Sequence, residues 1–129
     1  MKLLLIDDDE ELCVELEQVL KAEGFEVDIA FDGLQGLGRL REKQYHIIIL
    51  DLKLPGLNGY GVLKGIRKMA QPIKVLVLSG RPLGEPLLKE DGVSQDDQEE
   101  ILHMADAVIN KPFMVKDLLQ KVKELTLSQ

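Results

Sequence analysis

The sequence predicts a doubly wound parallel α/β fold, and two observations lead to this class. Short apolar runs alternate with amphipathic stretches along the whole chain, giving the order βαβαβαβαβα. Three of the runs are almost continuously apolar, which is typical of strands covered by helices on both faces. Right-handed crossovers are expected between the parallel strands. The predicted strands are residues 2–6, 25–29, 46–50, 73–78 and 106–109.

Five helices are expected between and after these strands, one of them within the long connection after Ser79. Residues 10–23 carry leucine and valine at helical spacing, with Glu and Lys on the other face, and Gly24 ends this helix. The next two helices each contain three glycines, so their stability must come from packing. Asp32 is placed as the entry to the first of these two helices, and the last helix begins after Pro112. The other predicted ranges are 33–43, 59–69 and 114–126.

Length and composition indicate one globular domain over residues 1–129, with no output domain attached. No apolar run is long enough for a membrane span or a signal peptide. The lone cysteine, Cys13, excludes an internal disulfide and suits a cytoplasmic location, where it serves as a small packing residue. A net charge of −7 argues against direct binding of nucleic acid by this chain.

Polar side chains follow the predicted strands at their carboxyl ends, which is where open parallel sheets place their functional crevice. Asp9 is assigned as the N-cap of the first helix, which leaves its two acidic neighbours for another role. Taken one at a time, each of these residues also suits an ordinary turn or helix start; their convergence on one rim argues for a site. The converging residues are Asp7, Asp8, Asp51, Ser79 and Lys111.

The chemistry of this set is coherent. Mg²⁺ prefers carboxylate oxygens together with phosphate oxygens, so Asp7 or Asp8 with Asp51 would suit the ion. A carboxylate can also act as a nucleophile toward phosphorus and form an aspartyl phosphate. The ion and the ammonium group of Lys111 would then neutralise the phosphoryl oxygens, while the hydroxyl of Ser79 adds a hydrogen bond.

Four motifs in order, LLLIDDDEEL, IIILDLKLPGLNGYGVL, VLVLSGR and AVINKPF, resemble the receiver domain of two-component response regulators over essentially all of the chain. The resemblance implies a single flavodoxin-like (βα)5 domain, like that of chemotaxis regulators, with a five-stranded parallel sheet of order 2-1-3-4-5. It also implies a phosphoprotein that reacts only by self-phosphorylation and autodephosphorylation, and is not otherwise an enzyme.

By this resemblance, Asp51 is the phosphoacceptor that takes a phosphoryl group from a histidine kinase. Asp7, Asp8 and Asp51 match the carboxylates that bind Mg²⁺, and Lys53 matches the residue whose backbone carbonyl also binds the ion. Ser79 and Lys111 match the residues that contact the phosphoryl group. Lys111–Pro112 resembles the cis peptide bond of the family.

The sequence departs from the family in two places. Val108 stands where receivers usually carry the aromatic residue that reports phosphorylation. The connection after Ser79 is also long, because 31 residues lie between Ser79 and Lys111. About 20 residues are expected between consecutive strands of this kind. The output switch over residues 80–96 is therefore expected to be atypical. Our hypothesis is that residues 81–96 form a mobile segment with a helical turn near 86–90.

Two other functions are compatible with parts of this pattern. One is a docking module of the same fold that signals without phosphorylation. The other is a phosphatase of the haloacid-dehalogenase type, which is disfavoured because Lys53 stands where that type has its second acid. The expected partners are a histidine kinase or phosphotransfer protein and an output protein or effector domain. The chain is expected to be a monomer or a weak dimer.

Overall fold

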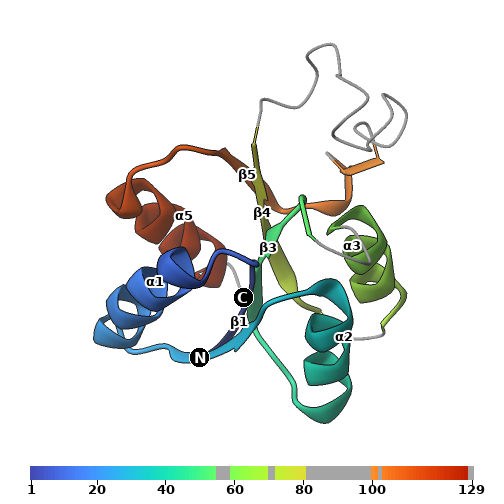
Figure 1. The fold of residues 1–129 in the computed structure, drawn as a ribbon. Helices are drawn as coiled ribbons and strands as arrows, with labels where there is room; N and C mark the ends of the chain where they lie inside the picture. The colour runs from blue at the N-terminus through green and yellow to red at the C-terminus, as the bar shows by residue number, and fades with distance from the viewer. Residues whose placement is uncertain (55–58, 70–71, 81–99, 102, 128–129) are drawn as a thin grey trace.

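The computed structural model describes residues 1–54, 59–69, 72–80, 100–101 and 103–127, and its five strands form one parallel sheet of order β2-β1-β3-β4-β5 (Figure 1). The predicted fold class and strand order are confirmed. The strands are β1 (Lys2–Ile6), β2 (Glu26–Ala30), β3 (Ile47–Asp51), β4 (Lys74–Ser79) and β5 (Ala107–Asn110). The helices are α1 (Glu10–Ala22), α2 (Gly33–Glu42), α3 (Gly59–Lys68) and α5 (Val115–Leu127).

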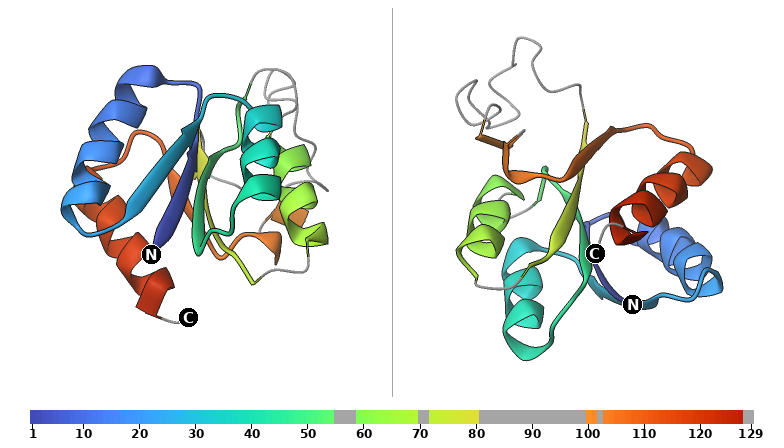
Figure 2. Two further views of the ribbon diagram at one scale, coloured as in Figure 1. Left: turned by 90° about the horizontal axis from the view of Figure 1, so that it is seen from below. Right: turned by 180° about the vertical axis from the view of Figure 1, so that it is seen from behind.

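Helices cover both faces of the sheet, with α1 and α5 on one face and α2 and α3 on the other (Figure 2). Alternate residues of a strand point to opposite faces, so each strand contributes to two hydrophobic cores. In β1, Leu3 and Leu5 pack on the α1 and α5 side, whereas Leu4 and Ile6 pack on the α2 and α3 side. This explains why β1, β3 and β4 read as continuous apolar runs.

The end of α1 shows why β2 starts one residue later than predicted. Gly24 has a φ of +96°, a conformation that favours glycine, and its amide donates to the carbonyl of Lys21. The amide of Phe25 donates to the carbonyl of Leu20, so it is used by the helix end and β2 begins at Glu26. The predicted stop at Gly24 is confirmed.

The predicted starts of α1 and α2 are also confirmed. The side chain of Asp9 accepts a hydrogen bond from the amide of Leu12 at 3.1 Å, and that of Asp32 accepts one from Gln35 at 2.8 Å. None of the helices in the part of the chain that the structure describes is long and apolar enough to cross a membrane. The predicted mobile segment at 81–96, with its turn near 86–90, lies outside the described residues.

Two glycines allow helices to approach the sheet closely. A Cβ atom on Gly36 in α2 would lie 2.6 Å from Cδ1 of Ile6, in the core beneath that helix. A Cβ atom on Gly59, the first residue of α3, would lie 2.4 Å from Cα of Leu52 and 2.5 Å from the carbonyl oxygen of Asp51. Gly59 therefore places the start of α3 directly against the carboxyl end of β3.

Replacing Gly59 by alanine tests this contact. We expect Gly59→Ala to lower the free energy of unfolding by about 1–3 kcal/mol, because its methyl group would meet backbone atoms that cannot turn aside. Gly38→Ala is the matched control. Gly38 lies in α2 with nothing within 4 Å of its Cβ position, so the same substitution should stabilise by about 0.5–1 kcal/mol. Urea denaturation measures the free energy of unfolding of both variants. If both were more stable than the wild type, the close contact at Gly59 would be contradicted.

Candidate functional site

The carboxyl ends of four strands bring the predicted site residues together. Asp7 follows β1, Asp51 ends β3, Ser79 ends β4 and Lys111 follows β5. Because β3 lies between β1 and β4 in the sheet, Asp51 lies between Asp7 and Ser79. Asp7, Asp51 and Ser79 are all buried, with exposed fractions of 0, 5 and 3%. Burial of two carboxylates side by side requires a compensating positive charge.

Lys111 supplies that charge. Its Nζ atom lies 3.0 Å from Oδ2 of Asp7 and 3.2 Å from Oδ2 of Asp51, and so joins the two acids. The other oxygen of each acid is also bonded: Oδ1 of Asp7 accepts the amide of Asp9 at 3.0 Å, and Oδ1 of Asp51 accepts the amide of Lys53 at 3.1 Å. Both carboxylates are thus held in fixed orientations.

The surroundings of the site raise the pKa of both Asp51 and Lys111, which disfavours the charged form of the acid and favours the charged form of the base. Burial, followed by the nearby charge of Asp7, raises the pKa of Asp51 to about 6, although the Lys53 amide and Lys111 act to lower it. Burial lowers the pKa of Lys111, but its bonds to Asp7 and Asp51 and their charges outweigh this and raise it. Lys111 therefore stays an ammonium ion, and Asp51 is a carboxylate at neutral pH.

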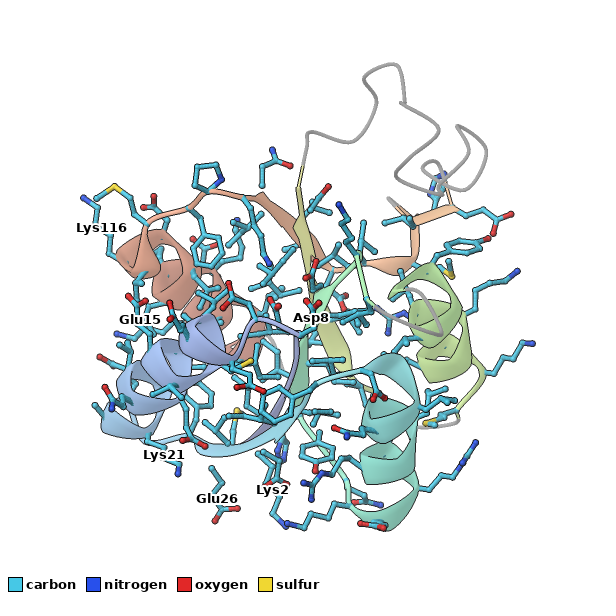
Figure 3. All side chains as sticks on the ribbon, in the orientation of Figure 1. Lys2, Asp8, Glu15, Lys21, Glu26 and Lys116 are labelled. Carbon is cyan, nitrogen blue, oxygen red and sulfur yellow. The ribbon has the colours of Figure 1, made fainter. Side chains whose placement is uncertain are left out.

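The acids fit a divalent metal ion. One carboxylate oxygen each from Asp7, Asp8 and Asp51 lies within 4.8 Å of the others, which is a suitable set of hard oxygen ligands for Mg²⁺. Asp8 is exposed, and Figure 3 shows it where β1 meets α1, at the opposite end of the strands from Lys2 and Glu26. The acidic cluster therefore has one carboxylate facing solvent and two buried ones.

The remaining predicted residues lie at the same rim. The carbonyl of Ser79 accepts the amide of Lys111 at 2.7 Å, which fixes Lys111 beside β4. Lys53 follows Asp51 by two residues and its side chain is exposed. The next residue after Ser79, Gly80, is exposed and leaves open space where a side chain would stand. The peptide bond between Lys111 and Pro112 is cis, as the resemblance implied.

Two other features refine the sequence predictions. Val108 is half-buried and packs against the core on the α2 and α3 side. Cys13 is buried, as predicted for a packing residue, and its Sγ also donates to the carbonyl of Asp7 at 3.4 Å. Burial, followed by the charge of Asp7, raises the pKa of its thiol to about 12. The sequence had no signal for this contact, because it depends on how α1 packs behind the acidic turn.

Comparison with known proteins identifies the family of this chain. The model of the response regulator receiver domain matches residues 3–123. The chain is 37% identical over 125 residues to the transcriptional regulatory protein CpxR homolog of Haemophilus influenzae, covering 96% of this chain and 49% of that protein. It is 34% identical over 125 residues to the transcriptional regulatory protein PrrA of Mycobacterium leprae, covering 96% and 49%. The chain thus spans about half the length of these curated relatives.

Solved structures give the same result. A CheY-like response regulator receiver domain protein from Methanospirillum hungatei superposes with a TM-score of 0.84 at 29% identity, covering 98% of this chain and 94% of that one. The response regulator TrrA from Thermotoga maritima, in complex with Mg²⁺–BeF, superposes with a TM-score of 0.78 at 28% identity, covering 96% and 97%. With its family model, its relatives and its fold in agreement, this chain belongs to the response regulator receiver domains of two-component systems.

Proposed function

We propose that this receiver domain accepts a phosphoryl group on Asp51 from the phosphohistidine of a histidine kinase or phosphotransfer protein. The observation that supports this most is the bridging position of Lys111. Its ammonium group lies within hydrogen-bonding distance of the proposed nucleophile, on the rim where the phosphoryl group would bind. A structural ion pair alone would not need a second buried acid, Asp7, and an exposed one, Asp8, in the same cluster.

The proposed reaction is a displacement at phosphorus. A carboxylate oxygen of Asp51 attacks the phosphorus atom, a P–O bond forms, and the P–N bond to the donor histidine breaks with its electron pair passing to the imidazole. Lys111 would pair with the phosphoryl oxygens as their charge develops, and the hydroxyl of Ser79 would donate a further hydrogen bond to them. The amide of Lys53 holds Asp51 in orientation throughout.

Asp7, Asp8 and Asp51 are the side chains that would hold Mg²⁺, with the backbone carbonyl of Lys53 as a further ligand. The bound ion would neutralise charge on the phosphoryl oxygens. The Mg²⁺–BeF complex of the Thermotoga maritima protein supports this assignment, because that protein shares the fold at 28% identity. Hydrolysis of the aspartyl phosphate by the domain itself would end the signal.

The output of this signal belongs to the same proposal. Val108 has no ring to move between exposed and buried positions, so the readout would differ from the aromatic switch of other receivers. The similar proteins from Haemophilus and Mycobacterium are transcriptional regulators about twice as long as this chain. This comparison supports a cytoplasmic location. It also supports two partners, which are a histidine kinase and an output protein or effector domain.

Intact-mass spectrometry tests the phosphoacceptor directly. After incubation with Mg²⁺ and acetyl phosphate, we expect one phosphoryl adduct on the wild-type chain, and none on Asp51→Asn or after chelation of the metal. Asp32→Asn is the control, because Asp32 caps α2 and asparagine caps a helix equally well. An unmodified wild-type chain would count against the proposal and favour the docking module.

The metal site can be tested without phosphorylation. We expect Asp8→Asn to weaken Mg²⁺ binding by roughly tenfold or more, that is by at least about 1.4 kcal/mol, because the ion would lose one anionic oxygen ligand. Asp9→Asn is the matched control: it removes the adjacent charge and keeps the N-cap of α1. Isothermal titration calorimetry at fixed pH measures both variants. Equal losses in the two would point to a diffuse acidic surface and not to a site.

A further inference from the structure

The segment that leads into β5 is hydrogen-bonded to α3 at two places, called here the two ties. Its described residues are Glu100, Ile101 and 103–106, called here the pre-β5 segment, and those from Glu100 to Met104 are helical. Ile101 is completely buried in the core that α3 also lines. The two ties lie at opposite ends of α3, and they differ in strength.

The first tie is a cluster of hydrogen bonds around Arg67, near the end of α3. Its guanidinium group donates to the carbonyls of Met104 and Ile73, with Nε 2.7 Å from the former and Nη1 2.8 Å from the latter. Nη2 lies 2.9 Å from Oδ2 of Asp106, which also accepts the amide of Val75 at 2.7 Å. The amide of Asp106 in turn donates to the carbonyl of Val75 at 2.9 Å. This end of the segment is fixed to both α3 and β4.

The second tie lies near the start of α3, where the hydroxyl of Tyr60 donates to the carboxylate of Glu100. Tyr60 is only partly buried and Glu100 is exposed, so water can replace this bond at small cost. The ammonium group of Lys64 lies 5.0 Å from the centre of the Tyr60 ring and holds the ring in place. A force on the start of α3 would therefore break this tie before the Arg67 cluster.

A backbone displacement at Asp51 would be transmitted to the start of α3. The amide of Gly59 donates to the carbonyl of Leu52 at 3.0 Å, and the helix is packed against the backbone of Asp51 and Leu52. A backbone shift at residues 51–54 would therefore displace Gly59. Tyr60, the next residue, would move with it.

We propose that phosphorylation of Asp51 releases the Tyr60 hydroxyl from Glu100 while the Arg67 cluster holds, so that the pre-β5 segment turns about its Asp106 end. This inference rests on the proposed phosphorylation of Asp51 and supplies a readout that needs no aromatic residue at position 108. In this proposal, Tyr60 and Glu100 position the pre-β5 segment and take no part in the phosphoryl transfer.

Tyrosine fluorescence tests this proposal, because the chain has no tryptophan and two tyrosines, Tyr45 and Tyr60. In Tyr45→Phe, Tyr60 is the remaining emitter, and a tyrosine hydroxyl bonded to a carboxylate emits weakly. We expect its emission to rise when Mg²⁺ and acetyl phosphate are added, in step with the mass adduct. The rise should be absent when Asp51→Asn is added to the variant. Adding Glu100→Gln should raise the starting emission and abolish the step.

Intact mass, recorded on the same samples, distinguishes failure of the proposed phosphorylation from failure of the proposed Tyr60 release. A mass adduct without a rise in Tyr60 emission overturns this proposal and leaves Asp51 as the phosphoacceptor. An undiminished rise in emission in the variant that also carries Glu100→Gln has the same meaning. A chain that gains no adduct overturns the proposed function and this inference with it. Should Tyr45→Phe fold poorly, 3-fluorotyrosine in the wild-type chain gives a fluorine resonance for each tyrosine. The Tyr60 resonance, assigned with Tyr60→Phe, must then shift with the adduct.

Discussion

The ion pairs of Lys111 with Asp7 and Asp51 are the interactions on which the rest of the site depends. Two carboxylates are buried next to each other at the carboxyl ends of β1 and β3, and the ammonium group of a residue 60 positions beyond Asp51 lies between them. Without it, the sheet would carry uncompensated charge in its interior. The acids are therefore held in place, but with more negative charge than one lysine neutralises.

That residual negative charge links fold to function. In the proposed function, the cluster of three acids and one base would bind a divalent cation, and a phosphoryl group bound with that cation would meet both the proposed nucleophile and an ammonium group on the same rim. The same rim touches α3 through Gly59, so a change at Asp51 has a direct mechanical route to Tyr60 and the pre-β5 segment. The proposed reaction and the proposed readout would then take place at neighbouring parts of one sheet edge.

Most of the fold and the location of the site could be predicted from the sequence, because both depend on local patterns. Apolar runs of four to six residues located the strands, and polar residues at their ends located the rim. The capping roles of Asp9 and Asp32 followed from their positions before helices. The Arg67 cluster, the Tyr60–Glu100 bond and the Cys13 contact with Asp7 could not be predicted, because they join residues whose proximity depends on packing between elements. The one-residue shift of β2 likewise depends on the hydrogen bond of Phe25 with α1.

The most direct test of charge compensation is the thermal stability of Asp51→Asn with and without Mg²⁺. The folded pKa of Asp51, about 6, lies above its ordinary value of 3.8, so its ionisation costs stability as pH rises between these values, and the full cost is present at pH 7.5. We expect Asp51→Asn to be more stable than wild type there by on the order of 2–3 kcal/mol in the absence of metal. Mg²⁺ should raise the melting temperature of the wild type and have little effect on the variant. A variant less stable than wild type, together with a wild type indifferent to Mg²⁺, would contradict the account.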